Sequence, residues 1–181
     1  MICKLQVLCE TSNEGICLIQ TKPGLRSPSK IKQMEKANEI KISYSQKSNT
    51  KNLLKITSST EANQIIQNSW DKDNIELFET FKVIYLNNSN VVKGISTIST
   101  GGITGTIIDI RMIFATALKT LSTAIILTHN HPSGTLRPSD ADKRMTEKII
   151  KAGELLDIKI LDHLIVTPNK DYYSFADNGL M

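Results

Sequence analysis

The segment STAIILTHNH, residues 122–131, constrains the fold more than any other part of the chain. Its centre is apolar without the alternation of a half-exposed strand, which is typical of a strand buried on both faces. Apolar residues recur at helical spacing before and after it, at Ile110, Phe114, Ala117, Leu121 and at Met145, Ile149, Ala152, Leu156. A buried strand between two amphipathic helices predicts an α/β sandwich, with helices covering a central sheet.

The remaining patterns fit the same architecture. The stretch TSSTEANQIIQNSW, residues 57–70, offers Ser/Thr caps and predicts a short amphipathic helix. ETFKVIYL, NNSN and VVKGISTIST, residues 79–100, follow as strand, turn and strand, and therefore predict a β-hairpin. IKILDHLIVT and DYYSFAD, residues 158–167 and 171–177, are expected to complete the sheet.

Charge divides the chain of 181 residues into two parts. Residues 1–56 carry ten Lys/Arg and four Asp/Glu, a net +6, whereas residues 57–181 carry twelve and fourteen, a net −2. We expect a basic, poorly organised N-terminal lead-in over 1–56 and one globular domain over 57–181. Any contact with nucleic acid is then expected only through the lead-in. No apolar run is long enough to span a membrane, and a cytoplasmic location is expected.

A pair of histidines ends the buried strand. His129 and His131 are two apart, so on an extended strand both imidazoles point to one face. Pro132 ends strand pairing, and Gly134 lets the chain turn back toward Asp142 at the start of the next helix. Two histidines and one carboxylate predict a catalytic zinc site with an open position, although the same ligands also hold iron, manganese or cobalt. Read singly, Ser139 and Asp142 are also a helix N-cap and its capping partner.

The sequence of this segment resembles that of a known family. His129-Asn130-His131-Pro132-Ser133-Gly134, then Ser139 and Asp142, is similar to the H-x-H-P, S-x-x-D motif of JAMM metalloproteases and to the bacterial RadC family. The resemblance covers residues 57–181 and implies a cytidine-deaminase-like (JAMM/MPN) α/β sandwich with a mixed central sheet. RadC chains often carry an N-terminal helix-hairpin-helix region, of which residues 1–56 show no recognisable version.

The resemblance also implies roles for individual residues. His129, His131 and Asp142 match the ligands of one Zn²⁺ per chain, and Ser139 matches the serine that hydrogen-bonds the oxyanion. Glu79, just before the first core strand, resembles the glutamate that accepts a proton from the attacking water, and Glu76 is the alternative. The implied activity is that of a zinc-dependent hydrolase, a metallopeptidase acting on a peptide or isopeptide, with a family association with DNA repair.

Several alternatives bear on this interpretation. A nucleobase deaminase needs H-x-E and P-C-x-x-C, which the chain lacks. The letters HNH do not make an HNH nuclease, because that motif spreads its residues widely. A non-catalytic metal-binding or DNA-repair-associated role stays open, as does the oligomeric state. Asn130 and Ser133 are candidates to fix the loop that carries the ligands. For Asp162 and His163 an orienting and a structural role are both open. FKVIYL is a candidate exposed edge for a peptide to join by β-addition.

Overall fold

The computed structural model describes residues 44, 54–71, 73–101 and 107–181. Its elements are α1 (Ser59–Gln67), β1 (Thr80–Leu86), β2 (Val92–Thr100), α2 (Ile110–Lys119), β3 (Ala124–Asn130), α3 (Asp140–Leu155), β4 (Lys159–Val166) and β5 (Tyr172–Ser174). Every helix and strand expected from the sequence within the described residues is present. The prediction for residues 1–56 lies almost entirely outside them.

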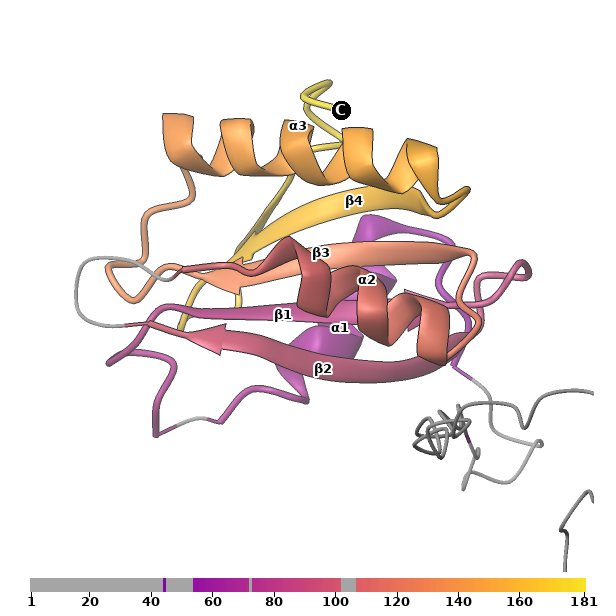
Figure 1. Cartoon of the computed structure of the whole chain (residues 1–181). Coiled ribbons are helices and arrows are strands. Elements are labelled where there is room, and N and C mark those ends of the chain that lie inside the picture. Colours follow the sequence, from indigo (N-terminus) through magenta and orange to yellow (C-terminus); the bar gives the residue numbers. More distant parts are fainter. Residues whose placement is uncertain (1–43, 45–53, 72, 102–106) are drawn as a thin grey trace, which may run out of the picture. The chain divides into compact units, whose positions relative to one another are not determined.

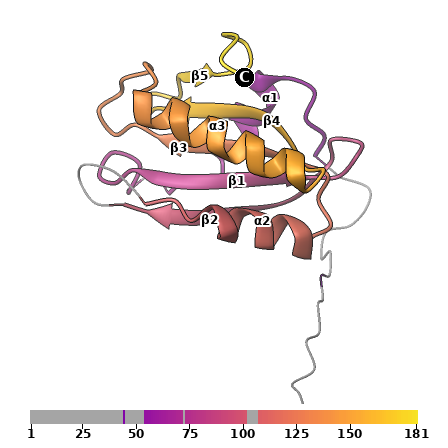
Figure 2. The same cartoon turned by 45° about the horizontal axis from the view of Figure 1, so that its top comes forward.

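The five strands form one mixed sheet in the order β2-β1-β3-β4-β5. β1 pairs antiparallel with both β2 and β3, β3 and β4 are parallel, and β5 returns antiparallel to β4. The parallel pair is joined through α3, as a parallel connection requires a crossover. The predicted mixed α/β sandwich is therefore confirmed, and the C-terminal ends of β3 and β4 lie together beside the start of α3 (Figures 1 and 2).

Helices cover both faces of this sheet. On one face α1 packs through Ala62 and Ile66 against the apolar side chains of β1, β3 and β4. On the other face α2 and α3 pack over the same three strands, with Phe114 and Ile149 among the buried contacts. Because β3 is covered on both sides, all seven of its residues are buried. The unbroken apolar pattern of this strand has that burial as its physical cause.

Each helix begins where the sequence supplies a cap. The side chains of Ser58, Asp109 and Ser139 accept a hydrogen bond from a backbone N–H in the first turn of α1, α2 and α3, respectively. These side chains satisfy donors that a helix start leaves without partners. Ser139 sets the residue at which α3 begins.

Three details differ from the sequence predictions. Leu121 and Leu156 were expected to face the core but are 76% and 41% exposed. Both lie just beyond the last turn of their helices, where the helical periodicity no longer applies. FKVIYL was expected to offer an open edge, yet β1 is paired on both sides, and β2 forms that edge of the sheet.

The described domain includes residues slightly before residue 57. Ile56 is 4% exposed and belongs to the α1-side core, and Lys55 forms an isolated antiparallel bridge with Val91. Within the part of the chain that the structure describes, no helix combines the length and the apolarity needed to cross a membrane.

Candidate metal centre

The three predicted metal ligands converge at the C-terminal end of β3. His129 is the penultimate residue of β3, His131 follows the strand, and Asp142 lies in the first turn of α3. The candidate ligand atoms of these residues all lie within 4.8 Å of one another. The crossover from β3 to α3 thus brings two residues of one strand end and one of a helix start to a single point.

The distances between these atoms suit one cation. His129 Nε2 lies 3.0 Å from His131 Nε2 and 3.4 Å from Asp142 Oδ1, and His131 Nε2 lies 3.9 Å from Asp142 Oδ2. Tetrahedral ligands at usual zinc bond lengths of about 2.0–2.2 Å are separated from one another by roughly 3.3–3.6 Å. The donor atoms therefore need to move only slightly to enclose such an ion.

A buried hydrogen-bond chain fixes the tautomer of His129. The Thr146 hydroxyl donates to the backbone carbonyl of Asp142 (2.7 Å), so toward His163 Nδ1 (2.6 Å) it can only accept. His163 therefore carries its proton on Nδ1, and its Nε2 accepts from His129 Nδ1 at 2.8 Å. As a result, His129 Nε2 has a free lone pair that faces the candidate metal position.

The second histidine is oriented by its own loop. His131 Nδ1 donates to the carbonyl of Thr135 at 2.6 Å, which leaves Nε2 unprotonated as well. The loop reaches back because Gly134 adopts φ +77°, a conformation that other residues rarely take. Ser133 Oγ stays within this loop by hydrogen bonding to Thr135. The predicted turn at Gly134 and the predicted loop contact of Ser133 are both confirmed.

The two oxygens of Asp142 have different partners. Oδ2 accepts from the backbone N–H of Ser139 (2.7 Å) and from its hydroxyl (2.6 Å), while Ser139 Oγ accepts from the Asp142 N–H (3.1 Å). This is a reciprocal capping box at the start of α3. Oδ1 is the oxygen that lies 3.4 Å from His129. The capping and metal-ligand interpretations of Asp142 are thus compatible in one carboxylate.

The chemistry of the three ligand atoms indicates which kind of ion fits between them. Both imidazole Nε2 atoms hold lone pairs, so no proton lies between His129 and His131 despite their 3.0 Å separation. A carboxylate oxygen completes the group, and three electron-rich atoms at this spacing repel one another without a positive charge between them. The residues therefore fit a divalent ion of the zinc class, which accepts imidazole nitrogen and carboxylate oxygen together.

Burial keeps the imidazoles of His129 and His163 neutral. His129 is 1% exposed, and this burial lowers its pKa to about 4, with the nearby Asp142 acting in the opposite direction. Phe81 stacks on the His129 ring from β1, and Phe175 stacks on His163. Burial also holds the pKa of His163 well below its usual value. Neutral imidazole is the form that binds a metal, so no proton has to be displaced at neutral pH.

Glu79 interacts electrostatically with this group. The pKa of Glu79 is raised, first by burial and also by the charge of Asp142, while His131 acts in the opposite direction. Those interactions place the Glu79 carboxylate within electrostatic reach of two of the three candidate ligands. Glu76 is exposed to solvent. The electrostatic interactions with the ligand group thus favour Glu79 of the two alternatives.

The residue between the two histidines positions Glu79. Asn130 points to the opposite face of the sheet and is fully buried. Its amide donates to the carbonyls of Ile75 (2.7 Å) and Phe78 (2.9 Å), and its Oδ1 accepts from the Thr80 N–H at 2.7 Å. The backbone on both sides of Glu79 is therefore tied to β3. From the sequence we expected Asn130 to fix the ligand loop, but its contacts are with the Glu79 segment.

Asp162 and His163 have separate roles. Asp162 accepts from the backbone of His163 and Ala176 and from Ser174 Oγ, so it satisfies buried donors where β4 meets β5. His163 orients His129. Thr146 is the residue of this hydrogen-bond chain that sequence reasoning missed. A buried threonine inside an amphipathic helix has no recognisable sequence pattern.

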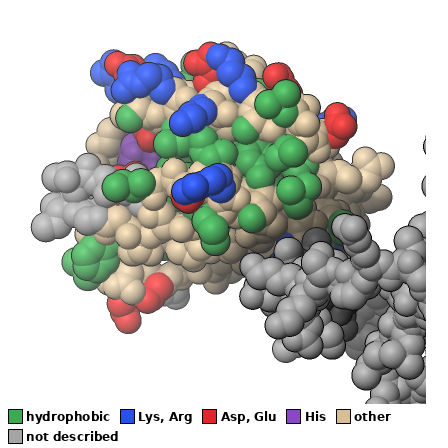
Figure 3. Space-filling model, viewed as in Figure 1, with side chains coloured by type: hydrophobic (Ala, Val, Ile, Leu, Met, Phe, Trp, Pro, Cys, Tyr) green, Lys and Arg blue, Asp and Glu red, His purple; other side chains and the backbone are tan. Residues whose placement is uncertain are grey.

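One side of the site is accessible. His129 and His163 are each 1% exposed, whereas the His131 side chain is 17% exposed. The histidine surface visible in Figure 3 therefore belongs chiefly to His131, and acidic surface lies next to it. A ligand can reach the candidate metal position from the side of His131 and Asp142, whose side chains are partly exposed.

Comparisons with known proteins agree with this geometry. Residues 56–180 match the family model described as "RadC-like JAB domain". The chain is 54% identical over 129 residues to a UPF0758 protein of Flavobacterium johnsoniae, which covers 71% of this chain and 54% of that protein. It is 44% identical over 103 residues to the UPF0758 protein YeeS of Escherichia coli, covering 57% of this chain and 69% of that protein.

A UPF0758 protein of Porphyromonas gingivalis is also 44% identical, over 103 residues, which is 57% of this chain and 45% of that protein. The chain thus spans about half the length of the Flavobacterium and Porphyromonas relatives that it matches. The family model, in contrast, covers the described domain almost from end to end. The chain therefore belongs to the RadC family, and residues 56–180 are its RadC-like JAB domain.

Proposed function

We propose that this protein is a metal-dependent hydrolase, a zinc metallopeptidase of the JAMM type that cleaves a peptide or isopeptide bond. Two findings together carry the proposal. Three ligand atoms converge, and one carboxylate outside the ligand set interacts electrostatically with two of the ligand residues. His129, His131 and Asp142 supply the ligands, and the Glu79 carboxylate interacts with two of them. A purely structural metal site has no use for that fourth group, and usually closes with a fourth ligand.

Each residue then has a defined task. A Zn²⁺ bound here supplies Lewis-acid chemistry that makes water a nucleophile at neutral pH and polarises a carbonyl. Glu79 takes the proton of the attacking water and delivers it to the leaving amine. Its raised pKa suits this exchange, because a general base works best when its pKa is nearer the working pH.

Ser139 is the candidate donor to the oxyanion. In the structure its hydroxyl donates to Asp142 Oδ2, so this role requires the O–H to rotate away from the carboxylate. The backbone N–H of Ser139 still donates to the same oxygen and keeps the capping box closed. The rotation therefore leaves Asp142 held in place while the hydroxyl is released toward substrate.

The first test is metal content. Protein purified without chelator is analysed by elemental mass spectrometry beside the His129→Ala/His131→Ala double variant. We expect close to one zinc per chain in the wild type and loss of that zinc in the variant. No bound metal, even after zinc addition, would contradict the proposed site.

The second test separates catalysis from binding. Zinc-loaded wild type, Glu79→Gln and Glu76→Gln are incubated with a mixed peptide library, and products are detected by mass spectrometry. Loss of a general base costs about 10²–10⁴-fold in rate. We expect that loss with Glu79→Gln at unchanged zinc content, and near wild-type cleavage with Glu76→Gln. Zinc binding with no cleavage by any form would favour the non-catalytic metal-binding role.

A further inference from the structure

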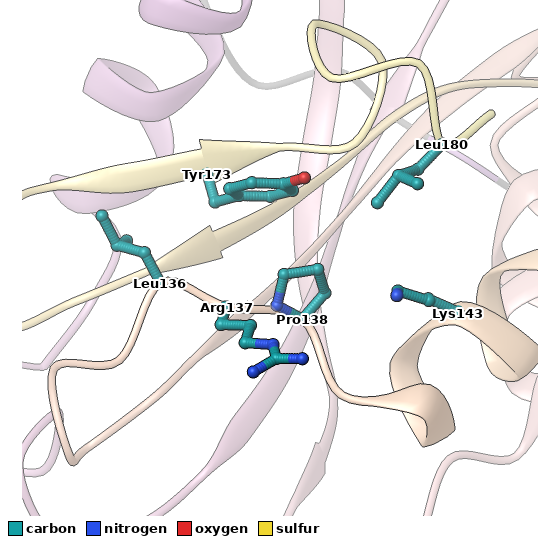
Figure 4. Close-up of a pocket in the computed structure, with 6 residues that line it drawn as sticks. All are labelled: Leu136, Arg137, Pro138, Lys143, Tyr173 and Leu180. Carbon is teal, nitrogen blue, oxygen red and sulfur yellow. The ribbon is translucent and has the colours of Figure 1, made fainter.

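A second hollow lies beside the candidate metal centre. It is a pocket of about 460 Å³ between the loop that follows His131, the start of α3, β5 and the end of the described domain. Its lining residues are Leu136, Arg137, Pro138, Lys143, Tyr173 and Leu180. Figure 4 shows Tyr173 and Leu180 on one side of the space and Arg137, Pro138 and Lys143 on the other.

The pocket is lined by residues next in the chain to those of the metal centre. Pro138 directly precedes Ser139, and Lys143 directly follows Asp142 in α3. Adjacent Cα atoms are about 3.8 Å apart, so two wall residues are chain neighbours of site residues. Leu136, a third wall residue, follows the Thr135 whose carbonyl orients His131. A substrate held at the metal therefore has its next groups within reach of this pocket.

Two positive charges line the pocket without counter-charges. Among the described residues, Arg137 and Lys143 form no side-chain hydrogen bond or ion pair, and no acidic residue lines the pocket. The exposed cations Arg111 and Lys151, in contrast, each pair with a carboxylate within four residues in the sequence, at 2.8 and 2.6 Å.

The rest of the wall is apolar. Leu136, Pro138 and Leu180 contribute hydrocarbon, and Tyr173 contributes a ring. In Figure 4 the Tyr173 hydroxyl and the Lys143 amine both extend toward the space between the two sides. An apolar surface with two cations at its margin suits a group that is partly hydrophobic and carries a negative charge.

We infer that this pocket binds a carboxylate of the substrate, next to an apolar residue, and so selects acidic peptides for the metal centre. The inference rests on the proposed peptidase function, because in an unmodified peptide the anionic groups are carboxylates. Such a carboxylate is either a Glu or Asp side chain or the free C-terminus of a peptide. Arg137 offers the planar fork that carboxylates accept, and Lys143 a second donor.

Binding without turnover provides the test. Three fluorescein-labelled peptides share one Ala/Leu sequence and end in Leu-Glu amide, Leu-Gln free acid or Leu-Gln amide. Their peptide parts carry a side-chain carboxylate, a terminal carboxylate or none, and the label is the same in all three. Fluorescence anisotropy with zinc-loaded Glu79→Gln, which holds the metal but is not expected to cleave the peptides, gives the dissociation constants. We expect one acidic peptide to bind about tenfold more tightly than the neutral one, the effect of one charge-assisted contact.

Variants assign the preference to the pocket. Arg137→Ala/Lys143→Ala should abolish the tenfold difference, while Arg144→Ala/Lys148→Ala removes the same two charges from exposed, non-lining positions of α3 and should keep it. Both double variants are made in the Glu79→Gln protein, and equal binding of all three peptides to Glu79→Gln with an intact pocket would overturn the inference. So would absence of binding, or an equal loss in both double variants.

Cleavage separates this inference from the proposed function. Library products enriched in acidic residues near the cut, with enrichment lost only in Arg137→Ala/Lys143→Ala, would support both. Cleavage without acidic preference would overturn the pocket inference alone. Acidic binding with no cleavage by zinc-loaded wild type would overturn the peptidase proposal and leave a carboxylate-binding pocket.

Discussion

His129 and His163, on the neighbouring parallel strands β3 and β4, are joined ring to ring by a hydrogen bond of 2.8 Å. His163 continues through Thr146 to the backbone of Asp142, so the chain of contacts begins at one candidate ligand and ends at another. The first-turn geometry of α3 and the orientation of the β3 imidazole are thus set together. A metal bound by both His129 and Asp142 would connect the two ends of this chain of contacts.

This chain of hydrogen bonds predicts that Thr146→Val weakens metal binding without removing a ligand. The variant keeps the shape of the side chain, but His163 Nδ1 loses its acceptor and the tautomer of His129 is no longer fixed. Loss of a contact behind a metal ligand costs about 10–100-fold in affinity. Zinc affinity, measured by competition with a chromogenic chelator, should fall by at least about tenfold.

Thr116→Val is the matched control. Thr116 on α2 also donates to the carbonyl four residues earlier, at 2.9 Å, but it is half-buried on another helix and belongs to no hydrogen bond described for the candidate ligands. Its zinc affinity should equal that of the wild type. Nitrogen chemical shifts of the His129 ring provide a second measurement, because they distinguish the Nδ1–H tautomer from its alternative. If Thr146→Val leaves both the zinc affinity and the His129 tautomer unchanged, the proposed role of this chain of hydrogen bonds is wrong.

Asn130→Asp is expected to separate catalysis from metal binding. The new carboxylate still accepts from the Thr80 N–H, but it faces the carbonyls of Ile75 and Phe78 with oxygen where the amide donated. A buried group left without its partners costs about 1–3 kcal/mol, and more when it is charged. The free energy of unfolding, from urea denaturation, should fall by at least that amount.

The Glu79 segment loses its anchor in this variant, whereas the metal ligands do not. Cleavage by folded Asn130→Asp should therefore fall at least about tenfold at unchanged zinc content, as expected for a displaced general base. Loss of zinc in proportion to activity would show instead that Asn130 supports the ligands.

Sequence reasoning reached the ligands because they follow local rules. His129 and His131 share a face through the two-residue repeat of a strand, and Asp142 is placed by a helix cap three residues after Ser139. The contacts of Asn130 were assigned to the wrong neighbour, since they depend on how far residues 75–80 fold back over the sheet. Such long-range placement follows from strand order, which no local pattern encodes.

Stability of the metal-free protein should fall on mild acidification. Burial lowers the pKa of His129 to about 4 and that of His163 well below 6.5, while both return to about 6.5 on unfolding. Below pH 6.5 the unfolded chain therefore binds protons that the folded chain does not. Each histidine lowers the unfolding free energy by up to about 1.4 kcal/mol per pH unit in this window.

Urea denaturation in chelator between pH 7.5 and pH 5 measures this slope. In His163→Gln the loss of unfolding free energy per pH unit should be smaller by the contribution of one histidine, even though the variant is less stable at every pH. A flat profile below pH 6.5, or an identical slope in His163→Gln, would contradict the neutral, buried state of the pair.

Gly153→Ala should destabilise the packing of α3 on β4. A Cβ at this position would lie 2.5 Å from the backbone oxygen of Ile158, and that oxygen belongs to the turn into β4. Overpacking of this kind costs about 1–3 kcal/mol. Gly94→Ala is the control, because nothing lies within 4 Å of its added Cβ. Thermal unfolding should show a lower midpoint for Gly153→Ala only, and equal midpoints would refute the close approach.

The limits of sequence reasoning also appear at helix ends and in the pocket. Helical spacing assigned Leu121 and Leu156 to the core, but each helix stops before that residue, and the last turn is where periodicity is least informative. Arg137 and Tyr173 lie 36 positions apart in the chain and meet only because β5 folds back along β4. No spacing rule brings them together.

The tripeptide His129-Asn130-His131 distributes its side chains to both layers of the sandwich, with the outer two on the α3 side and the middle one on the α1 side. A single inserted or deleted residue inside β3 would exchange these sides and disable ligand and anchor at once, whereas a two-residue change would preserve the alternation. Length changes in this strand are therefore tolerable only in pairs. The loops of the domain face no such parity constraint, and variation in chain length is expected to accumulate there.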